Sequence, residues 1–228
     1  MIKIVHAPHT SKYIPKEFLS DYKISLDRLE YLNEIYHDKY VDELVKDLEC
    51  VNILKFEYSR LFCDVERFNH ITEEMNQYGR GVLYTHDHNF DLIREVKNEK
   101  PIIDIYNNHH KKLDDVVEKH LKKGKVLIID LHSYSDELLI EKDDNLPDLC
   151  IGIDYFHYDG DVLSKILNIF KNENIIYNIN YPYSGSIVPI KYYNKDNNVI
   201  SIMLDFKKDF LENNIEKIKK IIKCITEI

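Results

Sequence analysis

The stretch 125-KVLIIDLHSYS-135 indicates a buried strand that runs into a polar segment. Four apolar residues at 126–129 lie between Gly124 and the segment that begins at Asp130. An apolar run of this length, bounded by turn-forming residues, is typical of an interior strand in a parallel or mixed sheet. Ligands of open α/β sheets bind beyond the carboxyl ends of the strands, which is where His132 falls. The alternative is a histidine that caps the next loop or is satisfied in the core.

Strand-like and helix-like segments alternate along the rest of the chain. Apolar patterns predict strands at 1–7, 51–58, 60–65, 81–85, 146–154, 174–182 and 197–206, and helices at 25–48, 101–123, 161–172 and 207–228. This alternation favours a three-layer α/β fold, with a mixed, mostly parallel sheet flanked by helices. Because no internal repeat and no linker interrupts the pattern, we expect one domain over residues 1–228.

Composition excludes several classes of partner. The 228 residues carry a net charge of −9 without any basic block, which argues against nucleic acid as a partner. No stretch approaches the roughly 18 apolar residues of a membrane span, and the start of the chain lacks a signal-peptide pattern, so we expect a cytoplasmic protein. The four cysteines form no CxxC pair, and Cys63 and Cys150 lie in apolar runs where a thiol packs as a small hydrophobic group.

Polar residues gather where predicted strands end. His9 follows the first strand, His132 the central one, and Asp205 ends the strand at 197–206. Asp64, Glu66 and Arg67 come at or just after the segment 60–65. A catalytic zinc usually takes three protein ligands plus water, and two histidines with a carboxylate meet that requirement. A further carboxylate could then serve as a general base.

Beyond these spacings, eight segments in order resemble the N-formylglutamate amidohydrolase family. They are PHTSKYIP (8–15), HDKYVDEL (37–44), YSRLFCDVERF (58–68), GVLYT (81–85), YNNHHKKL (106–113), IIDLHSYS (128–135), NYPYSGSIVP (180–189) and SIMLDF (201–206). The resemblance implies a fold similar to that of zinc carboxypeptidases and aspartoacylases, and a zinc-dependent amidohydrolase activity. In the first segment, Thr10 and Ser11 replace the usual Ser and Gly.

The resemblance also implies a metal site. His9 and His132 would bind Zn²⁺, and Asp38, which we place on the first long helix, would be the third ligand. Asp64 is the competitor for that third position, and the plainer reading of Asp38 is a solvated helix residue. By the same resemblance, Arg60 and Arg67 would grip a substrate carboxylate or polarise the scissile carbonyl, and a planar guanidinium suits the first task. Either arginine could instead pair with Asp64 or Glu66.

Position 205 would supply the catalytic base. The family has Glu at this position, followed by Asn and Arg, whereas this chain has Asp205, which is one methylene shorter. Because a misplacement of about 1 Å can cost roughly 100-fold in rate, Glu66 is kept as a second candidate base.

Three further residues would lie on the substrate side. His110 falls near the amino end of the predicted helix 101–123, and the loop with Ser184 and Gly185 allows a tight bend with hydroxyl donors. His86, His88 and His109 are expected on exposed loops rather than at a metal.

The sequence therefore predicts a zinc-dependent amidohydrolase that acts on a small N-acyl amino acid such as N-formylglutamate, with no nucleic acid or membrane as partner. Two alternatives stay open at this stage. One is a zinc carboxypeptidase or cell-wall peptide amidase on the same fold. The other is a small-molecule binding protein with a decayed site, which the shorter Asp205 and the altered first segment favour. The oligomeric state is left open.

Overall fold

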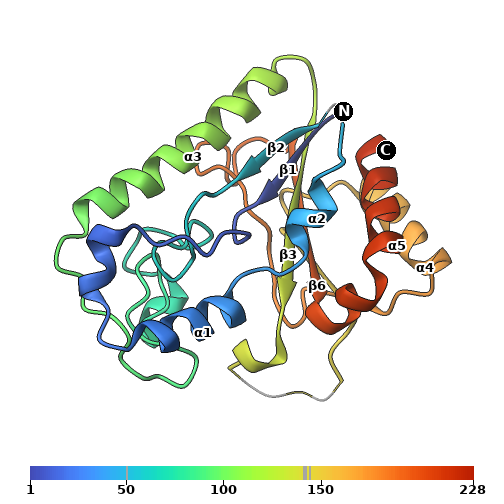
Figure 1. Ribbon diagram of the computed structural model, residues 1–228. Helices are drawn as coiled ribbons and strands as arrows, with labels where there is room; N and C mark the ends of the chain where they lie inside the picture. The colour runs from blue at the N-terminus through green and yellow to red at the C-terminus, as the bar shows by residue number, and fades with distance from the viewer. Residues whose placement is uncertain (50, 141–142, 144) are drawn as a thin grey trace.

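Six strands form one mixed sheet in the computed structural model, which describes residues 1–49, 51–140, 143 and 145–228 (Figure 1). The strands are β1 (Ile2–Ala7), β2 (Asn52–Lys55), β3 (Val126–Tyr134), β4 (Leu149–Ile153), β5 (Tyr177–Ile179) and β6 (Val199–Lys207), in the spatial order β2-β1-β3-β6-β4-β5. Neighbouring strands are parallel except β4 and β6, which are antiparallel. The predicted mixed, mostly parallel sheet is confirmed.

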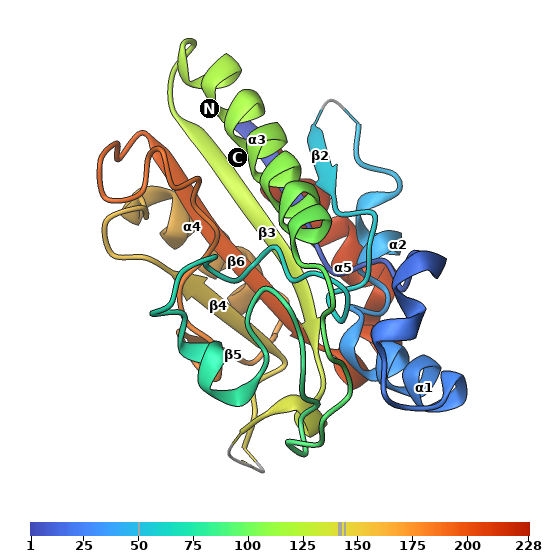
Figure 2. The same cartoon turned by 90° about the vertical axis from the view of Figure 1, so that its left-hand side faces the viewer.

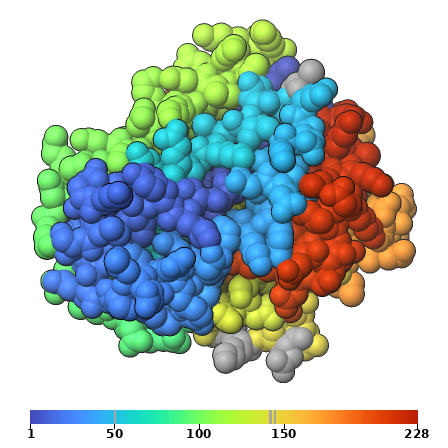
Figure 3. Space-filling view, in the orientation of Figure 1, coloured from blue at the N-terminus to red at the C-terminus, as the bar shows by residue number. Residues whose placement is uncertain are grey.

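Helices cover both faces of this sheet. They are α1 (Leu26–Tyr36), α2 (Val41–Val45), α3 (Lys100–Leu121), α4 (Gly160–Asn172) and α5 (Lys208–Glu227), with short 3-10 turns η1 (Lys16–Asp21), η2 (Glu74–Tyr78) and η3 (Asp136–Leu138). The long helix α3 crosses one face, while α2, α4 and α5 lie on the other (Figures 1 and 2). On the molecular surface α2 lies directly beside α5 (Figure 3).

The alternation of side chains along β3 determines which face carries the polar residues. Leu127, Ile129 and Leu131 pack into the core formed with α2, α4 and α5, whereas Val126 and Ile128 pack on the α3 side. Because successive side chains of a strand point to opposite faces, Asp130 and His132 continue the α3 side. The α3 face therefore changes from apolar to polar toward the carboxyl end of β3.

A third apolar core covers this polar end of the sheet. It is built from α1, the segment 56–65, the loop around Tyr84 and the first turns of α3. These segments lie beyond the carboxyl ends of the parallel strands (Figure 1). The polar side chains at this end of the sheet are buried. None of the helices in the described ranges is long and apolar enough to cross a membrane.

The predicted helix 25–48 is wrong in its middle, because the chain breaks between α1 and α2. The apolar residues of α1 pack into the third core, while those of α2 pack under the sheet on the α5 side. One straight helix cannot serve two cores that lie in different directions. The chain turns at His37–Tyr40, where Tyr40 takes a left-handed conformation (φ 70°). Asp38 consequently lies in a turn and not on a helix.

Two predicted strands are also absent from the described chain. The segment 60–65 forms a turn in which the N–H groups of Phe62 and Cys63 donate to Ser59 O. The segment 81–85 contributes only an isolated bridge between Arg80 and Tyr84. Both segments are apolar because they pack into the third core, and burial without a ladder partner produces the same pattern as a strand. Cys63 and Cys150 are buried free thiols, and Cys50 lies outside the described residues.

Candidate metal centre

His9, Asp38 and His132 converge at the carboxyl ends of β1 and β3. His9 lies in the loop after β1, Asp38 in the turn between α1 and α2, and His132 near the end of β3 rather than after it. Asp38 Oδ2 lies 2.9 Å from His132 Nδ1 and 3.6 Å from His9 Nδ1. All three residues are buried, and their ligand atoms are close enough together to hold one metal ion.

Backbone contacts position the turn that carries Asp38. The N–H of Asp38 donates to His9 O at 2.8 Å, which ties the turn to the loop after β1. The hydroxyl of Ser133 donates to Lys39 O at 2.9 Å, which ties the same turn to the end of β3. The three candidate ligands are therefore held by bonds between the segments that carry them.

A carboxylate also lies beside the outer nitrogen of each histidine, as a hydrogen-bond acceptor at His9 and as an ion-pair contact at His132. His9 Nε2 lies 2.9 Å from Asp64 Oδ1, and His132 Nε2 lies 3.1 Å from Asp130 Oδ1. Since an ionised carboxylate can only accept, each histidine keeps a proton on Nε2 and can offer the lone pair of Nδ1 to a metal. Within the described residues, His9 Nδ1 is buried without a hydrogen-bond partner. Two imidazole nitrogens and one carboxylate fit a zinc ion.

In the metal-free protein, Asp38 and His132 each stabilise the charged form of the other. Burial alone would raise the pKa of Asp38, but the hydrogen bond from His132 and the nearby charges of His132 and His9 outweigh it and hold that pKa well below its usual value. Burial would lower the pKa of His132, but Asp130 and Asp38 outweigh it and hold that pKa well above its usual value. A proton on His132 Nδ1 thus faces Asp38, and a metal would replace it.

Asp64 lies on the opposite side of the His9 ring from Asp38. Its Oδ2 accepts from Arg60 Nη2 at 2.9 Å and Nε at 3.2 Å, and its Oδ1 accepts from the N–H of Glu66 at 3.0 Å. Burial opposes its ionisation, yet Arg60 and His9 keep the pKa of Asp64 well below the usual value. Asp64 is therefore placed to orient His9 and Arg60, and Asp38 is the carboxylate that the structure brings to the two Nδ1 atoms.

The two arginines differ in how they contact Asp64. Arg60 is held by Asp64 through two hydrogen bonds, as the pairing alternative anticipated. Arg67 Nε lies 3.7 Å from Asp64 Oδ2 and has no hydrogen-bond partner among the described residues. The side chain of Arg67 is also more exposed than that of Arg60, at 27% against 14%. Of the two arginines, Arg67 is therefore the one with a guanidinium nitrogen, Nε, that is not hydrogen-bonded to Asp64.

Asp205 lies beside the candidate ligands on the neighbouring strand. It pairs in register with His132 across β3 and β6, so both side chains are on the same face. Burial, aided by the charge of Asp38, raises the pKa of Asp205 to about 8, against the opposing charge of His132. Its Oδ1 is buried without a hydrogen-bond partner in the described chain. A carboxyl group with these properties can take up and return a proton near neutral pH.

Lys208 is a nearby cation that sequence reasoning missed. Its ammonium group donates to Ile35 O and lies close enough to Asp38 and Asp205 for their charges to raise its pKa. Burial is the larger effect, so the pKa of Lys208 is lowered overall. Asp205 lies in strand β6, and Lys208 is the first residue of helix α5. The sequence alone does not locate the junction between strand and helix closely enough to place Lys208 at the site.

Glu66 belongs to a second group of polar residues, with His6 and Asp130. His6 Nδ1 lies 2.9 Å from Asp130 Oδ1 and 3.1 Å from Glu66 Oε1, and His6 is fully buried. Sequence reasoning missed Asp130 and gave His6 no role. The D-x-H spacing at 130–132 could have indicated Asp130, because residues two apart in a strand share a face.

The histidines of the segment 106–113 do not lie where they were predicted. His109 was expected on an exposed loop, but it is buried in the middle of α3 with Nε2 2.9 Å from His6 Nε2. His110 is also in mid-helix rather than near its amino end, with its ring 4.3 Å from that of Tyr106. The helix itself was predicted within two residues of α3, so the error lies in placing His109 on a loop and His110 near the amino end, when both fall in the middle of that helix.

The remaining predicted residues occupy the loop after β5. Gly185 has a positive φ of 79°, which supports the predicted tight bend, and its N–H lies 3.3 Å from Asn180 Oδ1. Ser184 is exposed.

His86 and His88 are half-buried and are not part of either metal-competent group.

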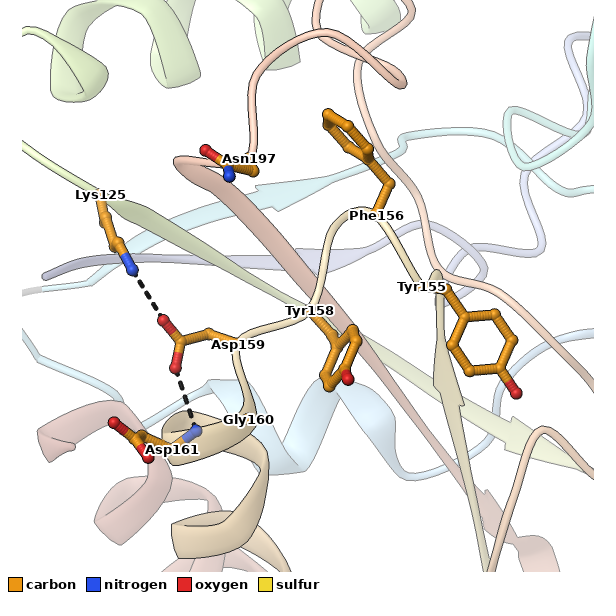
Figure 4. A pocket seen from close by; sticks show the side chains of 8 residues that line it. All are labelled: Lys125, Tyr155, Phe156, Tyr158, Asp159, Gly160, Asp161 and Asn197. Atoms are coloured by element: carbon orange, nitrogen blue, oxygen red, sulfur yellow. Dashed lines mark hydrogen bonds and ion pairs between the residues drawn. The ribbon is translucent and has the colours of Figure 1, made fainter.

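A hollow of about 670 Å³ lies at the other end of the strands. It is lined by Lys125, Tyr155, Phe156, Tyr158, Asp159, Gly160, Asp161 and Asn197 (Figure 4). Lys125 donates to Asp159 Oδ2 at 2.8 Å, while Asp159 Oδ1 accepts from the first N–H groups of α4. These polar groups satisfy one another, and Lys125 precedes β3, whereas the candidate ligands lie near the carboxyl ends of β1 and β3.

The fold defines an α/β protein with a mixed sheet, and solved structures share it. It is similar to an N-formylglutamate amidohydrolase from Ralstonia eutropha JMP134 (TM-score 0.79, 17% identity, covering 98% of this chain and 91% of that one). It is also similar to a gene product of Agrobacterium tumefaciens (TM-score 0.71, 14% identity, covering 99% and 87%). The chain belongs to the N-formylglutamate amidohydrolase family, whose sequence profile matches residues 3–211. No curated protein sequence matches the chain.

Proposed function

We propose that the chain is a zinc-dependent amidohydrolase that cleaves the amide of a small N-acyl amino acid, with N-formylglutamate as the first candidate. The observation that carries the proposal is the buried group of His9, Asp38 and His132, in which both histidines present Nδ1 to the same carboxylate. Membership of an amidohydrolase family supports the reaction class.

His9, Asp38 and His132 would hold the metal. Zinc bound there supplies Lewis acidity, which activates water and polarises an amide carbonyl. Asp64 accepts the Nε2 proton of His9, and the negative charge of Asp130, 3.1 Å from His132 Nε2, would favour a proton on that nitrogen. These contacts set the tautomers before any substrate arrives, which lowers the cost of reaching the reactive arrangement.

Arg67 would bind the carboxylate of the substrate. Its guanidinium has a donor without a partner among the described residues, and a planar guanidinium can bind a carboxylate through two parallel hydrogen bonds. Arg60 is already engaged by Asp64 and serves to fix that carboxylate. The substrate would thus be held at its acid end by Arg67, with its amide directed toward Asp205 and the histidines.

Asp205 would move the proton. In this role its carboxylate takes a proton from the attacking water and returns it to the nitrogen of the leaving amine. The pKa of about 8 suits both halves of that cycle near neutral pH. Glu66 is the weaker candidate, because its Oε1 lies 3.1 Å from His6 Nδ1 and it belongs to the other group, with His6 and Asp130.

The test is release of formate and glutamate from N-formyl-L-glutamate by the purified protein, before and after removal of metal with a chelator. We expect turnover that disappears with the chelator, returns with zinc, and is lost in Asp205→Asn without loss of bound zinc. Zinc binding without turnover of any N-acyl amino acid would favour a binding protein. Cleavage of peptides with no turnover of N-acyl amino acids would favour a peptidase.

A further inference from the structure

Two buried histidines take no part in the proposed reaction, yet they are connected to it. His109 Nε2 lies 2.9 Å from His6 Nε2, and His6 Nδ1 lies 2.9 Å from Asp130 Oδ1. The same oxygen of Asp130 lies 3.1 Å from His132 Nε2. A continuous line of contacts thus runs from α3 through β1 to the candidate metal ligand on β3.

The fold holds each member of this line in place. His6 and Asp130 are directly opposite one another in the register of β1 and β3, so their side chains share a face. His109 reaches them from α3, and the ring of Phe56 packs edge-on against it with centroids 5.1 Å apart. His6, His109 and Asp130 are each at most 4% exposed, so water cannot readily replace a missing partner.

Asp130 needs a donor to keep its orientation. Within the part of the chain that the structure describes, its Oδ2 accepts a single long contact of 3.4 Å from the N–H of Ile187, whereas its Oδ1 accepts the short one from His6. If the Asp130 carboxylate moved away from its contact 3.1 Å from His132 Nε2, its charge would no longer favour a proton on that nitrogen, and His132 could then carry its proton on Nδ1 instead. That tautomer has no lone pair to offer at Nδ1, on the side of Asp38.

We propose that His6 and His109 are positioning residues for the metal centre: His6 holds Asp130 against His132, and His109 holds the ring of His6. The inference rests on the proposed zinc site and adds two residues to it. Partners that orient a metal-binding histidine typically contribute 10–100-fold to metal affinity. The line from His109 to His132 is thus expected to set how tightly the protein binds zinc.

Four variants test this proposal. For each we would measure zinc affinity by competition with a chelator, the visible spectrum of the Co²⁺ form, and thermal unfolding of the metal-free protein. His6→Leu removes the contacts of His6 with Asp130, His109 and Glu66. His6→Asn keeps an N–H near the position of Nδ1 and so retains the donor to Asp130. His109→Leu removes only the far end of the line. His157→Gln is the matched control, since His157 is equally buried with both ring nitrogens bonded, but to Val199 O and the N–H of Asn194.

We expect His6→Leu to weaken zinc binding about 10–100-fold and to alter the Co²⁺ spectrum, and we expect His6→Asn to restore most of the affinity. His109→Leu should weaken binding about 10-fold and provides the answer if His6→Leu does not fold. His157→Gln should lower the unfolding temperature without changing zinc affinity.

Two results would overturn the proposal while leaving the zinc site intact. The first is wild-type zinc affinity in folded His6→Leu and His109→Leu. The second is a wild type that binds two zinc ions and loses one of them in His6→Leu, which would make His6 a ligand rather than a positioning residue. A wild type that binds no zinc would instead contradict the proposed function itself.

Discussion

Asp64→Asn is the substitution that separates orientation of a ligand from ligation itself. Asp64 is fully buried and accepts at 2.9 Å from both His9 Nε2 and Arg60 Nη2. Asparagine has nearly the same shape but offers one oxygen acceptor and one amide donor. Either Arg60, or His9 together with the N–H of Glu66, must therefore face an N–H group in place of an oxygen.

The structure indicates which neighbour keeps the oxygen. Arg60 always carries its protons, whereas His9 can change tautomer, so the amide oxygen should remain on Arg60. The amide N–H then donates to His9 Nε2, and the proton of His9 moves to Nδ1, where the zinc should bind. We expect zinc affinity to fall by about 100-fold, at the upper end of the range for such partners. Weakening the buried pair with Arg60 should also destabilise folding, by about 3–5 kcal/mol if the pair is broken.

The assay measures zinc affinity by chelator competition and the free energy of unfolding in urea for the metal-free protein. Asp87→Asn is a suitable control, because Asp87 is also fully buried and accepts from Arg28 Nη2 at 2.9 Å, but contacts neither candidate histidine. We expect the control to lose stability and to bind zinc normally. Wild-type zinc affinity in Asp64→Asn would refute the tautomer argument.

Three further predictions follow from the site. Asp205→Glu, which restores the length of the usual base, should raise kcat by up to about 100-fold, and an unchanged or lower kcat would show that the shorter side chain of Asp205 does not limit the reaction. Arg67→Met should raise KM for an N-acyl amino acid at least 10-fold with a smaller change in kcat, and an unchanged KM would show that Arg67 does not bind the substrate carboxylate. Zinc affinity should rise with pH from 6 upward. The raised pKa of His132 favours the protonated, metal-free protein at low pH, and this advantage is lost as pH rises through that pKa. Affinity that is independent of pH between 6 and 8 would contradict this.

Much of the fold follows from local patterns in the sequence. Three predicted elements agree with the structure within a few residues: the strand that begins with the apolar run 126–129, and the helices at 101–123 and 161–172. Their apolar residues pack in the layers on the two sides of one continuous sheet. The break between α1 and α2 could not be read in this way. Its apolar residues keep a helical period on both sides of the turn, and only the existence of two separate cores explains why the chain bends there.

The residues of the site also divide into those that the sequence indicated and those that it did not. His9, Asp38 and His132 were found through the family resemblance, and the structure brings them together. His6 and Asp130 were not assigned roles, because their proximity depends on the register of two strands more than a hundred residues apart. Contacts between such distant positions leave no periodic signal in a single sequence.

The measurement that tests the central claim most directly is the metal content of the purified protein beside a His132→Ala variant. The account predicts about one zinc per chain in the wild type and none in the variant, with the variant still folded. Absence of zinc from both proteins, even after incubation with the metal, would contradict the proposed metal centre.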